Sequence, residues 1–170
     1  MILTIDVGNT TVSVAIFEGD RIVFRNRLLT PSEITEQYLR SLIKWKLLGP
    51  SKCRIIVSSV VPLVDSQLKR VLKGLSGQDA IFIDCRSELD FSIAIDDPEE
   101  LGADLIAGAA GGFDFFVPPF IVIDSGTAIT VCCIDREKRF LGGSIMPGIE
   151  MAIRSLSSNT AKLGRIRFEV

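Results

Sequence analysis

An apolar strand pattern that ends on an acid and is followed by a glycine turn occurs twice in this 170-residue chain. The first copy is Ile2–Asp6 with Gly8-Asn9-Thr10, and the second is Phe120–Asp124 with Gly126-Thr127. In both copies a second strand-like stretch, a hairpin signal and a third strand-like stretch come next. Asp124 lies 118 residues after Asp6, and the same offset aligns the two glycines, Glu18 with Arg136, and Arg21 with Arg139. Chance could give one such echo, but the shared acid-x-Gly at one strand end favours a duplicated α/β unit.

Different numbers of helices and strands are expected after the two copies. After the first, the spacing predicts a helix opened by Pro31 and stopped by Gly49-Pro50, a second helix over residues 63–75 and a third from Pro98 to about Phe113. Buried strands are expected at residues 53–57 and 80–84. After the second, only a helix from Pro147 to about Ser157 is expected.

These elements predict a first domain over residues 1–115, with its linking helix, and a partial second domain over residues 116–170. A three-stranded sheet with one helix leaves an edge and much of one face uncovered. Either a partner covers that surface or the chain is shorter than the fold requires.

The residue composition and net charge of the chain exclude several classes of function. The chain has no histidine, which excludes Ser-His-Asp and Cys-His catalysis, and a net charge of −2 argues against nucleic-acid binding. The four cysteines form no CxxC pair, so reduced core thiols are expected. Asp6 interrupts any signal core and no apolar stretch of about 18 residues occurs, so we expect a cytoplasmic protein without a membrane span.

The first turn has the residue types of a phosphate loop. A glycine lets backbone N–H groups approach an anion, and Asn9 and Thr10 can donate side-chain hydrogen bonds. Asp6 would repel phosphate unless a cation lay between them, which indicates a Mg²⁺ ligand. Taken alone, the motif favours a plain Asx turn over a phosphate loop. The second copy favours phosphate, because two such turns around one cleft would suit a triphosphate.

Two further motifs are weaker. Asp104, in Leu101-Gly102-Ala103-Asp104-Leu105, could be a third acidic residue of the site or an ordinary first-turn acid of a helix. The stretch Gly142–Gly148 could be a nucleotide-side loop or a strand-to-helix turn.

Together these motifs resemble the type III pantothenate kinase family. The matching elements, in order, are DVGNT at 6–10, SSVVP at 58–62, DPEELGAD at 97–104, VIDSGTAIT at 122–130, GGSIMPGIE at 142–150 and the tail Thr160–Leu163. The resemblance implies the acetate and sugar kinase, Hsp70 and actin superfamily, with its duplicated ribonuclease-H-like (actin-like ATPase) α/β fold. It also implies a homodimer that transfers the γ-phosphate of ATP to pantothenate, the first step of coenzyme A synthesis. Mg²⁺ and a monovalent cation, K⁺ or NH₄⁺, would be required.

The resemblance assigns roles by position. ATP and phosphate would be bound by Asp6, Val7, Gly8, Asn9, Thr10, Gly126 and Thr127. Pantothenate would contact Gly102, Ala103, Asp104 and Leu105, with Asp104 as the catalytic base. Asp6 and Asp124 would serve the metal sites, Asp124 near the monovalent cation.

The chain also departs from the family pattern. Leu105 stands where the family has a pantothenate-contacting arginine, and Ile95 where it usually has tyrosine. Asp97 replaces an asparagine, and Ser125 replaces the phenylalanine of the second turn. Three interpretations stay open: an active or divergent pantothenate kinase, a degenerate homologue that binds nucleotide or a protein partner without catalysis, or a truncated kinase.

Overall fold

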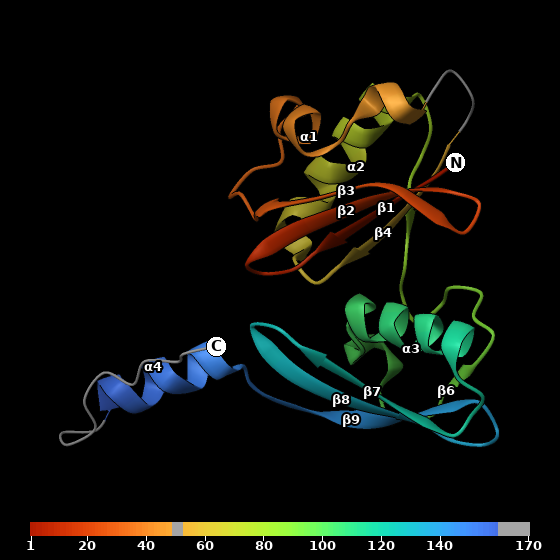
Figure 1. The fold of residues 1–170 in the computed structure, drawn as a ribbon, viewed down its shortest axis with the longest axis vertical. Coiled ribbons are helices and arrows are strands. Elements are labelled where there is room, and N and C mark those ends of the chain that lie inside the picture. Colours follow the sequence, from red (N-terminus) through yellow and green to blue (C-terminus); the bar gives the residue numbers. More distant parts are fainter. Residues whose placement is uncertain (49–52, 160–170) are drawn as a thin grey trace. The chain divides into compact units, whose positions relative to one another are not determined.

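The computed structural model describes residues 1–48 and 53–159 and divides the chain into two compact units (Figure 1). Unit 1 comprises Met1–Glu88 and Glu99–Ala107, and unit 2 comprises Leu89–Pro98 and the residues from Gly108 onward. The domain boundary expected after residue 115 stays a prediction, and so does the incompleteness of the second copy. The helix stop at Gly49-Pro50 and the tail motif at 160–163 lie outside the described residues.

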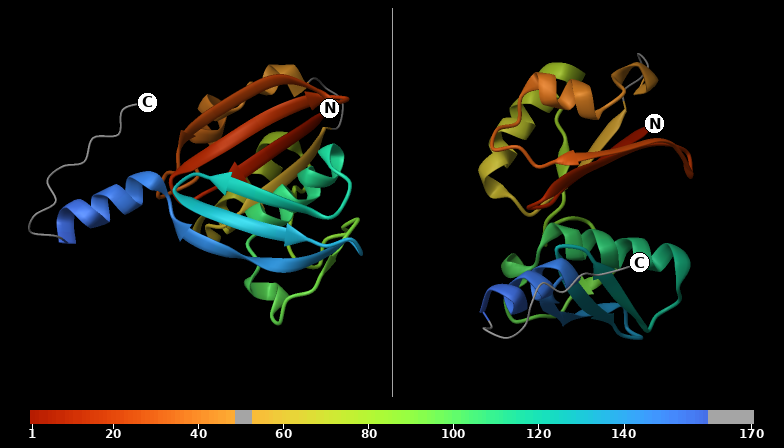
Figure 2. Two further views of the ribbon diagram at one scale, coloured as in Figure 1. Left: turned by 60° about the horizontal axis from the view of Figure 1, so that its bottom comes forward. Right: turned by 60° about the vertical axis from the view of Figure 1, so that its left-hand side comes forward.

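Unit 1 is a five-stranded sheet in the order β3-β2-β1-β4-β5. β1 pairs antiparallel with β2 and parallel with β4, β2 pairs antiparallel with β3, and β5 is parallel to β4. Two helices, α1 and α2, cover one face of this sheet, as the views in Figures 1 and 2 agree. The bounds are β1 Ile2–Val7, β2 Thr11–Glu18, β3 Arg21–Leu29, α1 Glu36–Leu42, β4 Arg54–Ser59, α2 Pro62–Ser76 and β5 Ile81–Phe82.

The alternation along β1 decides which face each side chain takes. Leu3, Ile5 and Val7 are at most 1% exposed and belong to the core that α1 and α2 cover. Successive side chains of a strand point to opposite faces, so Thr4 and Asp6 lie on the face away from these helices. The hydrophobic pattern that builds the core thus also places Asp6 on the open face.

The predicted continuous helix from Pro31 to Leu48 is wrong. α1 begins after its N-cap Thr35, whose Oγ1 accepts a hydrogen bond from the Tyr38 N–H, and it ends at Leu42. Asn26 Nδ2 on β3 donates to the Leu42 carbonyl at 3.0 Å, and Ile43 turns extended and is buried. A short 3₁₀ helix, Trp45–Leu48, comes next. Helical spacing continued through this break because both segments bury apolar side chains on one core.

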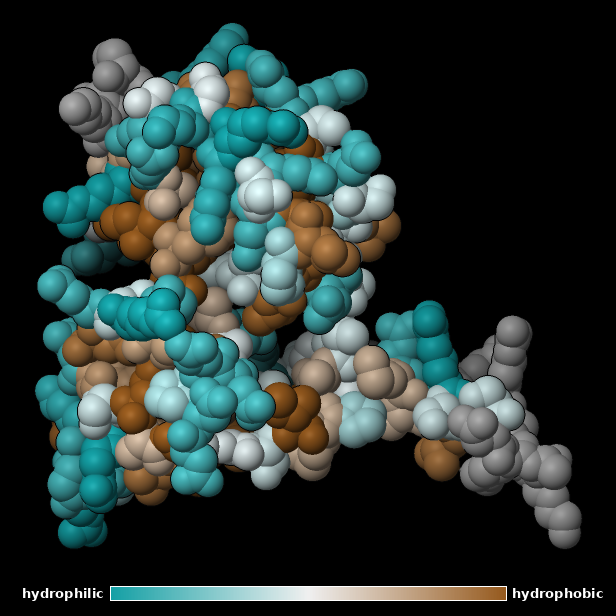
Figure 3. Space-filling view, turned by 180° about the vertical axis from the view of Figure 1, so that it is seen from behind, coloured by the Kyte–Doolittle hydropathy of each residue, from teal (hydrophilic) through white to brown (hydrophobic). Residues whose placement is uncertain are grey.

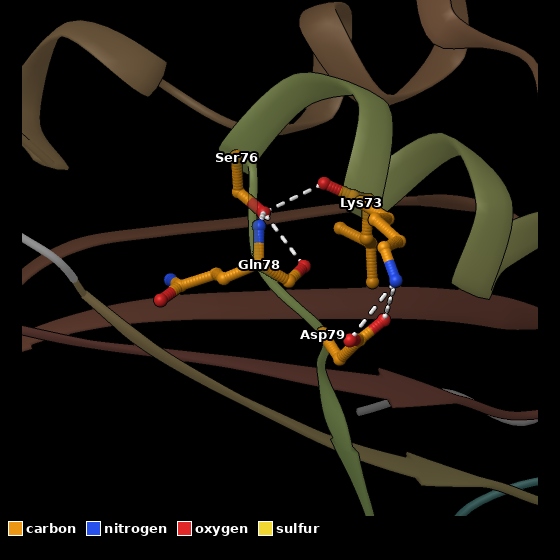
Figure 4. A network of polar contacts seen from close by, with 5 residues as sticks. Lys73, Ser76, Gln78 and Asp79 are labelled. Carbon is orange, nitrogen blue, oxygen red and sulfur yellow. Dashed lines mark hydrogen bonds and ion pairs between the residues drawn. The ribbon is translucent and has the colours of Figure 1, made fainter.

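The end of α2 is closed by a small polar network (Figure 4). Ser76 Oγ donates to the Leu72 carbonyl at 2.7 Å and accepts from the Gln78 N–H at 3.3 Å, while Lys73 pairs with Asp79. Gly77 takes the left-handed conformation that ends many helices. β5 comes after this network, and it is shorter than the predicted strand over residues 80–84.

Unit 2 holds a four-stranded sheet in the order β6-β9-β8-β7. The part of helix α3 that belongs to unit 2, from Gly108 onward, packs on one face of this sheet. There Phe113 contacts the rings of Phe91 and Phe120, and Ile134 and Phe140 are buried. The bounds are β6 Ser92–Ile93, α3 Ala103–Phe115, β7 Phe120–Ser125, β8 Ala128–Ile134, β9 Arg139–Pro147 and α4 Ile149–Asn159.

Two details of this region differ from the prediction. Pro98 opens a short 3₁₀ helix, Pro98–Glu100, and α3 begins only at Ala103. β6 was not predicted, because two residues are too short to show a strand period; its pairing partner, β9, is distant in sequence.

The repeated strand–turn–strand–hairpin–strand unit is present in both sheets, but a constant offset of 118 is wrong across its middle strand. Gly8 N bonds to the Thr11 carbonyl, whereas Gly126 N bonds to the carbonyl of Ala128, so the second turn is one residue shorter. Between the residues that close each hairpin, Asp135 with Arg139 and Glu18 with Arg21, the second loop is one residue longer, at 136–138 against Gly19-Asp20. A register shift occurs at the matching point in both copies, at Ile16/Phe17 and Cys133/Ile134.

Equivalent core positions have opposite environments in the two units. Ile121 and Ile123 of β7 correspond to Leu3 and Ile5 of β1, yet they are 60% and 67% exposed. Their strand partners on β8 continue the same apolar face, and Figure 3 shows hydrophobic side chains at the surface of this unit. In unit 1 this face lies under α1 and α2; in unit 2 the packed helix, α3, lies on the other face.

Two remaining expectations concern thiols and membranes. In the part of the chain that the structure describes, Cys53, Cys85, Cys132 and Cys133 form no disulfide, as predicted, and burial raises the pKa of the Cys53 thiol. Over residues 1–48 and 53–159, no helix is long and apolar enough to cross a membrane.

The unequal cover of the two sheets predicts unequal costs for one substitution. Ile5→Ala should lower the free energy of unfolding by about 2–5 kcal/mol, because it opens a cavity in a closed core. Ile123→Ala, the matched control at the equivalent position, should cost less than about 1 kcal/mol. Urea denaturation of both variants measures this. A cost at Ile123 equal to that at Ile5 would contradict an open face and indicate that it is covered in solution.

Candidate functional site

The first acid-glycine turn stands at the end of β1. Asp6 is exposed on the face away from α1 and α2, and Asn9 and Thr10 are exposed at the tip of the turn. The Gly8 N–H donates to the Thr11 carbonyl at 3.0 Å and closes the turn. Val7 is fully buried, so only its backbone could serve a ligand.

Two neighbouring segments hold this turn in place. Thr30, just after β3, donates from Oγ1 to the Gly8 carbonyl at 2.6 Å and from its N–H to the Thr10 carbonyl at 2.9 Å. On the other side, the Val60 N–H donates to the Val7 carbonyl at 3.0 Å. Sequence reasoning missed Thr30, because nothing in its local pattern distinguishes it from an ordinary residue after a strand.

The open face beside Asp6 carries both signs of charge. Asp6 lines a hollow of about 510 Å³ together with Ser13, Arg25 and Arg27, among others. Arg27 Nε donates to Ser13 Oγ at 2.9 Å. Guanidinium groups next to an acid suit a bound anion that is shared with a cation.

The second acid-glycine turn lies at the end of β7. Asp124, Gly126 and Thr127 are exposed, and the Gly126 N–H donates to the Ala128 carbonyl at 2.9 Å. The Gly148 N–H donates to the Thr127 carbonyl at 2.9 Å, and a Cβ at Gly148 would lie only 2.2 Å from the Gly126 carbonyl oxygen. Most of the stretch from Gly142 thus belongs to strand β9, which ends at Pro147, and Gly148 packs on the backbone of this turn.

The expected substrate motif forms the start of α3. Asp104 is exposed in the first turn of the helix, and its Oδ1 accepts a hydrogen bond from the Leu105 N–H at 2.8 Å. A Cβ at Gly102 would lie 2.5 Å from that Oδ1, so glycine leaves room for the carboxylate. Ala103 is buried and Leu105 is half-buried.

The structure brings the predicted residues together in separate groups. Asp6, the first turn and Gly102–Leu105 belong to unit 1, whereas Asp124 and the second turn belong to unit 2. Ile95 also belongs to unit 2, where its side chain lies next to Gly142 of β9. Within the described part of the chain, no three acidic or cysteine side chains converge on a ready-made metal site.

Comparison with known proteins identifies the family of the chain. A family model described as type III pantothenate kinase matches residues 2–170. The type III pantothenate kinase of Solibacter usitatus is 34% identical over 174 residues, which cover 99% of this chain. That of Legionella pneumophila (strain Corby) is 37% identical over 168 residues and 96% of the chain. The chain spans 66% of the length of both relatives.

Solved structures agree on the fold. A protein of Sinorhizobium meliloti described as a 2-dehydro-3-deoxygalactonokinase matches with a TM-score of 0.60 at 14% identity, covering 95% of this chain and 58% of that one. A Campylobacter jejuni protein described as a Baf family transcriptional activator matches with 0.57 at 22% identity, covering 95% and 62%. The predicted actin-like, sugar-kinase type of α/β fold is confirmed.

The contacts of Thr30 predict a local effect on the first turn. Thr30→Val keeps the shape but removes the 2.6 Å bond to the Gly8 carbonyl, so stability should fall by about 0.5–1.5 kcal/mol. Amides of residues 8–11 should exchange with solvent faster. Thr4→Val is the matched control, because Thr4 Oγ1 makes only a long 3.4 Å bond to the Ala15 carbonyl. Equal exchange of the turn in both variants would show that Thr30 does not hold it.

Proposed function

Because this chain belongs to the type III pantothenate kinase family, we propose that it phosphorylates pantothenate with ATP, as the first step of coenzyme A synthesis. The observation that carries the proposal is the pair of acid-glycine turns, each closed by its own backbone bonds and both within the residues that the family model matches. We further propose that the enzyme requires a divalent and a monovalent cation, and that it is a homodimer in the cytoplasm.

The first turn supplies the groups that triphosphate binding needs. Asn9 and Thr10 present exposed donors, Thr30 and Val60 restrain the backbone around them, and Asp6 lies directly beside the turn. Mg²⁺ is commonly held by one or two carboxylates together with substrate phosphates, so a three-acid cluster is not needed. When bound, the cation would neutralise charge on the phosphates.

The second turn supplies a comparable set. Thr127 is exposed next to Asp124, and Gly148 supports the backbone from behind. In the proposal Gly126 and Thr127 bind phosphate and Asp124 lies near the monovalent cation. Ser125 leaves this turn's backbone pattern intact, since the glycine bond forms with serine at that position.

Asp104 would accept the proton of the attacking hydroxyl. Its carboxylate is exposed at the first turn of α3 and is oriented by the Leu105 N–H. Phosphoryl transfer passes through a loose transition state, so the reaction asks little of the residue that takes the proton.

The pantothenate side supports a second candidate function. Leu105 cannot supply the charged donors of an arginine, and Ile95 cannot supply a phenolic hydroxyl. A homologue that binds nucleotide or a protein partner without turnover would have this pattern. The exposed apolar face of Ile121 and Ile123 is where such a partner, or a second copy, would find hydrophobic surface.

A coupled assay with ATP, Mg²⁺, K⁺ and pantothenate separates the two functions. We expect phosphopantothenate, with Leu105→Arg raising kcat/KM for pantothenate by about tenfold or more, the value of one charge-assisted contact. Leu105→Met is the matched control and should change little. Binding of Mg·ATP without product, even at high enzyme concentration and in Leu105→Arg, would reject the kinase and favour the non-catalytic homologue.

A second substitution tests the position of Asp104. Gly102→Ala places a methyl group against the Asp104 carboxylate and should lower kcat at least tenfold, with little loss of stability. Gly111→Ala, in the same helix, has no atom within 4 Å of the new methyl group and should leave kcat unchanged while stabilising α3. If both variants keep the wild-type kcat, the Asp104 carboxylate is not the base.

A further inference from the structure

Ser58, near the end of β4, lies directly beside Asp6. The parallel register of β1 and β4 pairs Asp6 with Ser58, and the antiparallel register of β1 and β2 pairs Asp6 with Ser13. Paired residues of neighbouring strands project to the same face of a sheet. The carboxylate of Asp6 is therefore flanked by two serine hydroxyls on the face that carries the first turn.

The serines around this point are used differently. Ser13 Oγ accepts from Arg27 Nε at 2.9 Å. Ser59 Oγ donates to Asp65 Oδ1 at 2.6 Å and accepts from the Val61 N–H at 3.2 Å, which ties β4 to the start of α2. Ser58 is only 6% exposed, and its Oγ finds no hydrogen-bond partner among residues 1–48 and 53–159.

A buried hydroxyl without a partner is unfavourable, because it has lost its hydrogen bonds to water and gained none. Ile55 and Val57 of the same strand are buried without losing any side-chain hydrogen bond to water, because their side chains are apolar. An alanine at position 58 would likewise avoid the unfavourable burial of a hydroxyl. A hydrogen-bonding group of a bound ligand would complete this hydroxyl, which lies beside an acid and a phosphate-type turn.

We propose that Ser58 is a positioning residue of the phosphate site, whose Oγ accepts a hydrogen bond from a water molecule hydrating the divalent cation held at Asp6. The inference rests on the proposed function, because it takes Asp6 to serve a metal–nucleotide complex. Mg²⁺ usually keeps several of its waters in protein sites, and a bridging water gives a bond almost as good as a direct one. The water would restore the bond that the buried hydroxyl lacks.

The neighbouring serines allow a matched test. ATP is titrated by calorimetry into the wild-type chain, Ser58→Ala, Ser58→Thr and Ser59→Ala, at several Mg²⁺ concentrations and in EDTA, and thermal unfolding is measured for each. Ser58→Ala should bind Mg·ATP about fivefold more weakly than wild type and need more Mg²⁺, with equal affinity in EDTA. Its melting temperature without ligand should be unchanged or raised, because the orphan hydroxyl is gone. Ser58→Thr should restore binding to within about twofold.

Ser59→Ala should do the reverse, with a lower melting temperature and unchanged Mg²⁺ dependence, because it loses the link to Asp65. Wild-type affinity of Ser58→Ala at every Mg²⁺ concentration would overturn the inference and leave the kinase proposal intact. Mg·ATP binding that depends on Ser58, without any phosphopantothenate formed, would support the inference and reject the kinase. No Mg·ATP binding by the wild-type chain would overturn both.

Discussion

The pairing of β1 with β2 on one side and β4 on the other is the constraint on which the rest of unit 1 depends. Because the side chains alternate, the same strand buries Leu3, Ile5 and Val7 under the helices and presents Asp6 on the opposite face. A register slip of one residue would exchange these faces and remove core and candidate site together. The acid is thus positioned by the hydrophobic core and not by a flexible loop.

The second unit repeats the strands of this arrangement but not its surroundings. The acid, the glycine and the bulge recur, and the one-residue slip across β8 is absorbed by the turn before it and the loop after it. Around β7, however, the packed helix lies on the opposite face, and Ile121 and Ile123 are exposed where their counterparts are buried. The proposed phosphate-binding turns depend on the strands and their connections, which both units have, and not on which face of the sheet the helices cover.

Much of this architecture could be predicted from the sequence. The strands of both copies are indicated by apolar runs bounded by turn residues, and the family resemblance is confirmed over residues 2–170. The break of α1 could not be predicted, because it depends on Asn26 reaching the Leu42 carbonyl from another element. Thr30 and Ser58 were missed as candidate site residues for the same reason: their significance comes from neighbours distant in sequence.

In the proposed function, each of the two acid-glycine turns binds phosphate of a Mg–nucleotide complex. Hydrogen–deuterium exchange of the whole chain with and without Mg·ATP tests it most directly, because it reports where the nucleotide binds and does not require turnover. Slower exchange at residues 8–10 and at residues 126–127, lost when Mg²⁺ is removed, is the predicted result. Unchanged exchange at both turns, with saturating nucleotide present, would contradict the account.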